Sequence, residues 1–256
     1  MANKLVELKN VTKSFGKVRA LDNVSMYVGE NEIVGLIGDN GAGKSTLIKI
    51  LSGVHAPDSG EIYVRGERVH HWSVAKAQKA RIETVYQDRA LVVQQSIARN
   101  IFMGREMTGL LGLIQVRKQY DEAERLMREI GFTSKVFTPD SVVATLSGGE
   151  RQGVAIARAM YFDADLIILD EPTTALSLTE SEKVFNFMRA AKDQGHSTIF
   201  ISHNIYHAYD VADRFVILDR GRVVVEADKA HYPSAQGLVE ELQLIARTGR
   251  HSAAQA

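Results

Sequence analysis

The fold class is decided by one stretch, Glu32-Ile33-Val34-Gly35-Leu36-Ile37-Gly38-Asp39-Asn40-Gly41-Ala42-Gly43-Lys44-Ser45. Its first part, 33–37, is a continuous apolar run, which indicates a strand covered on both faces. Residues 38–45 match G-x-x-x-x-G-K-S in full, and apolar residues at 47, 48 and 51 indicate a helix after them. A strand, a glycine-rich turn and a helix in this order predict a loop that binds the phosphates of a nucleoside triphosphate.

Each residue type in this loop has a physical reason to be there. The glycines let the backbone wrap closely around the phosphates and aim its N–H groups inward, and the following helix adds its positive N-terminal end. Lys44 is expected to reach the β- and γ-phosphates, and the Ser45 hydroxyl to hold Mg²⁺. The predicted nucleotide-binding residues of the loop are Gly38, Asp39, Asn40, Gly41, Ala42, Gly43, Lys44, Ser45 and Thr46.

A second apolar run, 166–169, ends in two acids, Asp170 and Glu171. Carboxylates at this point lie near the phosphate loop if the two strands are neighbours. Asp170 is then a candidate Mg²⁺ ligand, directly or through water, and Glu171 is a candidate to orient and polarise the attacking water. A pair of solvated acids at a strand end is the competing interpretation, and the phosphate loop upstream argues against it.

Three further side chains are candidates. His203 follows the predicted strand 197–202, so it emerges at the carboxyl edge where ligands gather and could contact the γ-phosphate and Glu171. On spacing alone, such a histidine is more often structural. Gln87 also ends a predicted strand, and its amide can reach Mg²⁺ or the water. Phe15 could present its ring face to adenine, or it could be a core aromatic. The other seven histidines are interpreted as surface or loop residues.

Composition excludes several classes of function. A chain of 256 residues can bury a real core. Its 31 basic and 31 acidic residues balance, so no global field favours nucleic acid or anionic lipid. The absence of cysteine excludes a disulfide scaffold and thiolate metal sites. The first residues contain no apolar signal segment, and no run approaches the roughly 18 apolar residues that span a bilayer. A membrane role is therefore expected to go through a partner.

The order of predicted elements indicates a mainly parallel α/β fold. Two alternating segments, 5–11 and 21–28, predict an antiparallel pair of strands, and 61–64 with 68–70 predict a hairpin. The pattern is then mostly helical before strands return at 165–169. We expect one domain with a core at about 1–87 and 159–247, an inserted helical subdomain at about 88–158 and a C-terminal tail at 248–256.

A second glycine-rich turn, Leu146-Ser147-Gly148-Gly149-Glu150, opens another predicted helix between the phosphate loop and the two acids. The chain therefore carries two surfaces suited to phosphate. Because one nucleotide needs only one of them, the second surface points to a shared site.

Taken together and in this order, residues 38–45, Gln87, 146–150, 166–171 and His203 resemble the ATP-binding subunit of an ABC transporter over nearly the whole chain. The resemblance implies ATP and Mg²⁺ as cofactors, a P-loop NTPase core with an antiparallel β subdomain, and an inserted helical lobe. It also implies a head-to-tail dimer. The residues expected to contact the partner's ATP are Ser147, Gly148, Gly149 and Glu150.

Finer resemblance favours a substrate class. The segments 86–88, 100–106 and 172–177 look like those of the ribose/xylose/fructose class of bacterial sugar importers. Most members of that class fuse two ATPase domains, and one such domain, as here, resembles its fructose importers. The implied partners are a second copy of the subunit, a permease whose short helix would enter a groove beside Gln87, and indirectly a solute-binding protein. The implied location is the cytoplasmic face of the inner membrane, with no nucleic acid bound.

One residue departs from the family pattern, since Ser177 stands where an aspartate usually contacts the partner subunit. Ser177-Leu178-Thr179-Glu180 also fits a capping box for the next helix, which is the interpretation favoured for the serine itself. Three alternatives remain open at this stage. They are an importer of amino acids or peptides, a non-transport ABC ATPase that acts on nucleic acid or in translation, and a P-loop kinase or nucleotide switch that works alone.

Overall fold

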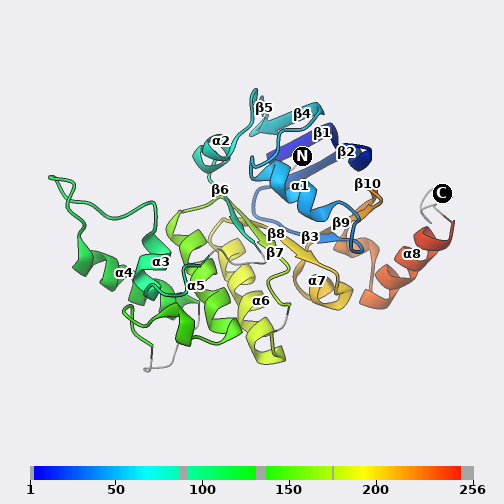
Figure 1. Ribbon diagram of the computed structural model, residues 1–256. Coiled ribbons are helices and arrows are strands. Elements are labelled where there is room, and N and C mark those ends of the chain that lie inside the picture. The colour runs from blue at the N-terminus through cyan, green and yellow to red at the C-terminus, as the bar shows by residue number, and fades with distance from the viewer. Residues whose placement is uncertain (1–2, 87–90, 131–136, 175, 249–256) are drawn as a thin grey trace.

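The computed structural model describes residues 3–86, 91–130, 137–174 and 176–248 (Figure 1). A six-stranded sheet of order β10-β9-β3-β8-β7-β6 forms the centre, and a four-stranded antiparallel sheet of order β2-β1-β4-β5 lies beside it. In the central sheet, the pairs of β9, β3, β8, β7 and β6 are parallel, and β10 pairs antiparallel with β9. This confirms the predicted α/β class with an antiparallel β subdomain and a helical lobe.

The strands are β1 Lys4–Phe15, β2 Val18–Gly29, β3 Ile33–Ile37, β4 Ser59–Val64, β5 Glu67–Arg68, β6 Ile82–Val85, β7 Leu166–Asp170, β8 Ser197–Ser202, β9 Arg214–Asp219 and β10 Arg222–Asp228. The helices are α1 Lys44–Leu51, α2 Val74–Lys79, α3 Ile97–Phe102, α4 Val116–Glu129, α5 Gly148–Tyr161, α6 Leu178–Asp193, α7 Ile205–Val211 and α8 Ala235–Thr248, with 3₁₀ turns η1 Val143–Thr145 and η2 Lys229–His231.

The central sheet separates two hydrophobic cores, and the alternation of side chains along each strand decides which core a residue enters. In β3, Ile33 and Ile37 join the core on the side of helices α3 to α8, whereas Val34 and Leu36 join the core on the side of α1 and the small sheet. Both faces of the strand are thus covered, as its continuous apolar run predicts.

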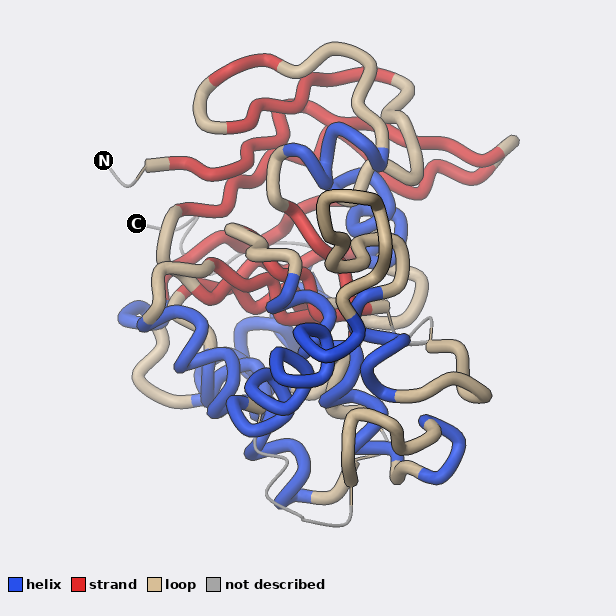
Figure 2. Tube along the Cα trace, turned by 90° about the vertical axis from the view of Figure 1, so that its left-hand side faces the viewer, coloured by secondary structure: helices blue, strands red, loops and turns tan. Residues whose placement is uncertain are grey.

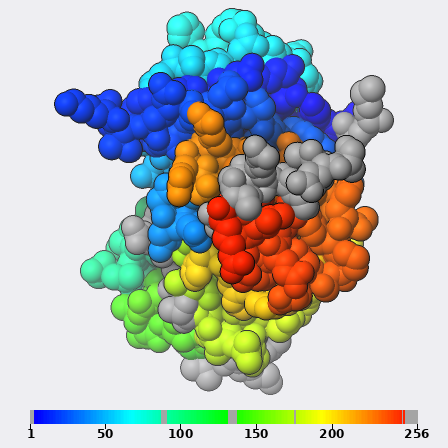
Figure 3. All heavy atoms as spheres, turned by 90° about the vertical axis from the view of Figure 1, so that its right-hand side faces the viewer, coloured from blue at the N-terminus to red at the C-terminus, as the bar shows by residue number. Residues whose placement is uncertain are grey.

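The small sheet extends beyond the body of the molecule as a hairpin. Strands β1 and β2 pair from Lys4 with Gly29 to Phe15 with Val18, and the turn uses Gly16 in a left-handed conformation (φ 60°). Figure 2 shows the outer part of this hairpin projecting to one side, and in the space-filling view of Figure 3 it forms the blue projection at the left, away from the red surface of α8. The predicted antiparallel pair is confirmed, with longer strands.

A buried arginine fastens the small sheet to the central one. Arg214 of β9 donates to Glu32 and Glu226, each at 2.6 Å, and to the carbonyl oxygen of Tyr27 in β2 at 2.7 Å. Its guanidinium also lies 4.1 Å from the centre of the Tyr27 ring, and only 4% of the side chain is exposed. One cation thus joins β2, β9 and β10 at the end of the sheet that carries β10.

One sequence prediction is corrected by the structure. The second strand of the predicted hairpin, 68–70, is β5, which covers only Glu67–Arg68. The chain turns away after it because Trp72 is buried with its Nε1–H donating to the Ile50 carbonyl at the end of α1. Strands β3 and β7 are not neighbours, since β8 lies between them. Among the described helices, none is long and apolar enough to cross a membrane.

Candidate functional site

The glycine-rich loop between β3 and α1 is held by close backbone contacts. A Cβ atom at Gly38 would lie 2.3 Å from the Leu218 carbonyl oxygen, and one at Gly43 would lie 2.6 Å from the Ala20 carbonyl oxygen. Gly43 also has φ 107°, which favours glycine. The loop is therefore pinched between β2 and the end of β9, and its glycines are required by space as well as by conformation.

Lys44 is the first residue of α1, and its ammonium lies inside the loop. It donates to the carbonyl oxygens of Gly38 at 2.5 Å and Asp39 at 3.0 Å, and only 7% of the residue is exposed. Burial lowers the pKa of this ammonium, and the negative charges of Glu171, Asp39 and Asp170 oppose the shift. An anionic phosphate beside Lys44 would act in the same direction as these carboxylates, so the site favours such a ligand.

The carboxyl ends of the parallel strands bring the candidate residues to one edge of the central sheet. The phosphate loop follows β3, His203 follows β8, and Asp170 ends β7. The condition that β3 and β7 pair directly is not met. The acids nevertheless lie close enough to act on Lys44 electrostatically, because only one strand separates them. His203 comes from that middle strand.

Glu171 is held in place from both sides. One carboxylate oxygen lies 3.3 Å from His203 Nδ1, and the other accepts a hydrogen bond from the Thr174 hydroxyl at 3.0 Å. Its backbone has φ 47°, a left-handed conformation that is uncommon for residues other than glycine. Its N–H donates to the Ile201 carbonyl of β8 at 3.1 Å. The carboxylate is thus aimed by the backbone, by His203 and by Thr174 together.

The donors expected to hold Mg²⁺ have suitable chemistry. Ser45 is exposed at the start of α1, and Asp170 is half-buried at the end of β7. Hydroxyl and carboxylate oxygens are the ligand types that Mg²⁺ prefers. The third predicted ligand, Gln87, lies outside the described residues. Within the described part of the chain, no group of three or more His, Cys, Asp or Glu side chains could bind a metal without a nucleotide.

Phe15 ends β1 at the tip of the projecting hairpin, and 45% of it is exposed, so it is not a core aromatic. Its ring meets the His55 ring edge-on at 5.3 Å, and Lys13 Nζ lies 5.6 Å from the ring centre. An exposed ring with one covered edge is available to stack on a planar base.

The turn 146–150 forms the N-terminus of α5 as predicted. Ser147 is the N-cap, its hydroxyl oxygen accepts from the Glu150 N–H at 3.2 Å, and its own N–H donates to the Glu150 carboxylate at 2.7 Å. This reciprocal pair is a capping box. Ser147 and Gly148 are exposed, so their polar groups can face a second molecule.

Ser177 caps α6 in the same way, which confirms the favoured interpretation. Its hydroxyl accepts from the Glu180 N–H at 3.3 Å, and its N–H donates to the Glu180 carboxylate at 3.0 Å. The same Glu180 carboxylate also accepts a hydrogen bond from the Ser147 hydroxyl at 3.3 Å. The two capping boxes are therefore joined by one carboxylate, a contact that the sequence analysis missed.

A second residue missed by sequence reasoning is His207, which was interpreted as a surface or loop residue. It lies in α7 with its Nδ1 3.2 Å from the Thr173 hydroxyl and its ring 5.5 Å from the ring of Phe185. Thr173 is buried two residues after Glu171. The contact links α7 to the segment that carries the catalytic candidate, and its signal in the sequence is no stronger than that of any other helical histidine.

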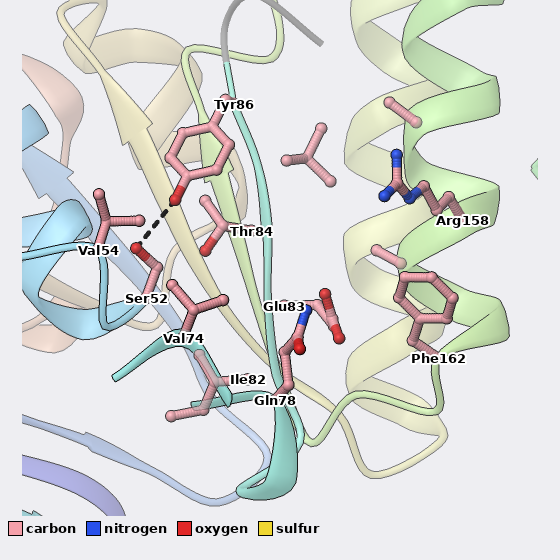
Figure 4. Close-up of a pocket in the computed structure, with 13 residues that line it drawn as sticks. Ser52, Val54, Val74, Gln78, Ile82, Glu83, Thr84, Tyr86, Arg158 and Phe162 are labelled. Carbon is pink, nitrogen blue, oxygen red and sulfur yellow. Dashed lines mark hydrogen bonds between the residues drawn. The ribbon is translucent and has the colours of Figure 1, made fainter. Parts of the chain in front are cut away.

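A cleft of about 180 Å³ lies between β6 and α5 (Figure 4). Val54, Val74 and Tyr86 line one wall, and Phe162 of the segment after α5 lines the other. Its polar floor is Glu83, which accepts from Arg105 at 2.7 Å. Burial raises the pKa of the Glu83 carboxyl, against the opposing charges of Arg105 and Arg158. The cleft is open, is lined by polar and apolar side chains in nearly equal measure, and adjoins the carboxyl end of β6.

Comparison with known proteins agrees with this geometry. The sequence pattern of the ABC transporter family matches residues 21–174. The chain is 45% identical over 227 residues to the xylose/arabinose import ATP-binding protein XylG of Sulfolobus acidocaldarius, and the match covers 88% of each chain. It is 40% identical to the fructose import ATP-binding protein FrcA of Rhizobium meliloti, over 85% of this chain and 86% of that one.

Other similarities are partial or concern the fold. The ribose import ATP-binding protein RbsA of Caldanaerobacter subterraneus subsp. tengcongensis is 35% identical over 88% of this chain, which spans 45% of that relative. The ATP-binding cassette MJ1267 has a TM-score of 0.82 at 21% identity, over 95% of this chain and 98% of that one. A dimeric post-hydrolysis structure of the cassette MJ0796 with ADP and phosphate has a TM-score of 0.75 at 27% identity, over 88% and 98%.

Proposed function

The chain belongs to the ABC transporter family, and from this premise we propose that it is the ATP-hydrolysing subunit of an importer for a monosaccharide of the xylose, ribose or fructose kind. The observation that carries the proposal is the presence on one chain of both halves of a shared ATP site, the phosphate loop 38–45 and the exposed turn 147–150. The names of the relatives support the choice of sugar.

The reaction is hydrolysis of the bond between the β- and γ-phosphates. Lys44 binds the oxygens of these phosphates, and the loop N–H groups surround them. Glu171 orients a water molecule and accepts its proton while the water oxygen attacks the γ-phosphorus in line. The bond to the bridging oxygen breaks, which leaves ADP and phosphate. His203 holds the Glu171 carboxylate in this position and reaches toward the γ-phosphate.

Magnesium fits the donors available beside the phosphates. Ser45 and Asp170 would hold the ion, and Gln87 is the third predicted ligand. When bound, Mg²⁺ neutralises charge on the β- and γ-phosphate oxygens. Phe15 stacks on the adenine, which places the base against the hairpin of β1 and β2 and the phosphates at the start of α1.

The second half-site belongs to a second copy of the chain. Ser147, Gly148 and Gly149 contact the γ-phosphate held by the partner, and Glu150 fixes Ser147 through the capping box. ATP then stabilises the closed dimer, and hydrolysis removes the contacts that hold it closed. This alternation converts the free energy of hydrolysis into movement.

The movement reaches the membrane through a permease. The cleft beside β6 and α5 takes a short helix of the permease, because it is open, offers both apolar and polar side chains, and lies between the core and the helical lobe. The core corresponds to about 1–87 and 159–247, and the helical subdomain to about 88–158. The subunit is peripheral, on the cytoplasmic face of the membrane, and a solute-binding protein delivers the sugar on the other side.

Two experiments test the proposal. In a strain that lacks this chain, uptake of labelled xylose, ribose and fructose is compared with uptake of an amino acid, after complementation with the wild type or with Glu171→Gln. Restored uptake of a sugar by the wild type alone supports the function, and restored uptake of the amino acid instead identifies a different importer of the same family.

The shared site has its own test. Ser147→Arg places a large cation where the partner's γ-phosphate must approach. Each monomer should still bind ATP through its own phosphate loop, while hydrolysis is abolished. Loss of ATP binding by the monomer would show that Ser147 contacts the ATP of its own chain, contrary to the proposal.

A further inference from the structure

The donor groups that the shared site requires are already engaged within the chain. Glu180 Oε1 accepts a hydrogen bond from the Ser147 hydroxyl at 3.3 Å, and the N–H of Gly149 also donates to this carboxylate. The carboxylate lies against the Gly149 Cα, since a Cβ there would be only 2.3 Å from Oε1. An anionic side chain thus occupies the position at the N-terminus of α5 that the partner's γ-phosphate would take in the shared site.

These bonds exclude a simultaneous phosphate. The Ser147 hydroxyl has one proton, and its oxygen already accepts from Glu150 N–H. That proton can go to Glu180 or to a phosphate oxygen, and the single N–H proton of Gly149 faces the same choice. A phosphate at this point would also lie beside the Glu180 carboxylate, and like charges at such a distance repel.

We propose that Glu180 is a positioning residue of the ATPase cycle, which holds the Ser147 and Gly149 donors in the free subunit and releases them to the partner's γ-phosphate when the dimer closes. The inference rests on the proposed shared site. It adds a step to the closure of that site. When the dimer closes, the partner's γ-phosphate replaces the Glu180 carboxylate as the acceptor of the Ser147 and Gly149 donors.

Ser177 holds one oxygen of the Glu180 carboxylate, so the other oxygen can leave Ser147 and Gly149 and return to them. Its N–H and its hydroxyl both donate to Glu180 Oε2, at 3.0 Å and 2.9 Å, so this oxygen stays held while Oε1 is exchanged. An aspartate at 177 would lack the hydroxyl donor and would add a second negative charge beside Glu180. The serine that departs from the family pattern and Glu180 therefore form one unit.

The test uses Glu171→Gln as the parent, so that ATP drives dimerisation without turnover. The ATP concentration at half-maximal dimer is measured by light scattering at fixed protein concentration. Glu180→Gln should lower this midpoint about threefold to tenfold, since one exposed charge-assisted hydrogen bond no longer competes. ATP affinity of the monomer should not change. Glu182→Gln is the matched control, because it removes the same charge from the same helix, at a carboxylate that lies 3.9 Å from Arg189.

An unchanged or higher midpoint in Glu180→Gln, or an equal shift in Glu182→Gln, would overturn the inference and leave the shared site standing. If the parent never dimerises with ATP, the shared site itself fails. Hydrogen exchange of the Gly149 amide in the monomer tests separately whether the Glu180 carboxylate holds this N–H. Glu180→Ala should speed it, and an unchanged exchange rate would show that Glu180 does not hold this donor.

Discussion

Replacing Arg214 by leucine tests how the small antiparallel sheet is fastened to the central sheet. The guanidinium is 4% exposed and joins Glu32, Glu226 and the Tyr27 carbonyl. Leucine keeps much of the apolar volume and removes the cation. Two carboxylates and one carbonyl oxygen are then left in a half-buried place without their donor, and the cation–π contact with the Tyr27 ring is lost.

The expected loss in free energy of unfolding follows from the burial of the ion pairs, and its pH dependence follows from the direction of the Glu226 pKa shift. Removing one partner of a buried ion pair costs about 3 to 5 kcal/mol. Because the Glu32 and Glu226 side chains are 18% and 31% exposed, we expect a loss near the lower limit, about 3 kcal/mol, at pH 8. Burial already raises the pKa of the Glu226 carboxyl above its ordinary 4.5, against the charge of Arg214.

Between pH 8 and pH 5, the variant should therefore lose less free energy of unfolding than the wild type does. Without Arg214, the pKa of Glu226 in the folded chain rises further, so the folded state binds a proton more readily than the unfolded state. Such a group stabilises the fold below its unfolded pKa, and this contribution is lost as pH rises through the folded pKa. The deficit of Arg214→Leu should be smaller at pH 5 than at pH 8.

Urea denaturation followed by far-UV circular dichroism at both pH values measures this deficit. Arg222→Leu is the matched control, since it makes the same change at an arginine that is 68% exposed and pairs with Asp22 of β2, and it should have little effect. If the two variants lost the same free energy of unfolding, burial of Arg214 would not be the reason why its contacts stabilise the fold. A larger deficit at pH 5 than at pH 8 would refute the sign of the Glu226 shift.

Three further changes have defined outcomes. Glu171→Gln should lower steady-state ATP turnover by about 10²- to 10⁴-fold without changing thermal unfolding, and near-normal turnover would remove Glu171 from its role. Trp72→Phe loses the donor to the Ile50 carbonyl and should lower the free energy of unfolding by about 1 kcal/mol in urea denaturation, where no loss would contradict the bond. Gly38→Ala places a Cβ 2.3 Å from the Leu218 carbonyl oxygen, and fluorescent-nucleotide titration should show at least about tenfold weaker binding. Unchanged affinity would mean that the loop can move.

Local signals in the sequence predicted the elements well. The capping box Ser177 to Glu180 and the apolar stripe of the next helix predict its bounds, and α6 is observed at Leu178–Asp193. Strand 197–202 is likewise observed as predicted. The glycine-rich loop and the acids at the end of β7 reach the same sheet edge because both follow parallel strands.

The order of the strands in the sheet and the contacts between distant residues were harder to predict from the sequence. Buried parallel strands all read as apolar runs, so nothing in 166–169 or 197–202 says that β8 separates β7 from β3. Whether Phe15 was a core residue depended on how far the hairpin extends beyond the body, which its own residues do not show. The bond from Ser147 to Glu180 joins polar side chains 33 positions apart, and polar contacts at that distance have no periodicity to reveal them.

The place of β6 in the central sheet has a consequence for the subunit when it is alone. In the described part of the chain β6 is the last strand of the sheet, and its residues line the cleft. Unpaired strand edges template aggregation, and natural proteins limit the risk with short strands and charged side chains. β6 has four residues and carries Glu83, paired with Arg105. The ion pair of Glu83 with Arg105 thus places charge on this edge of the sheet and limits pairing of β6 with another chain.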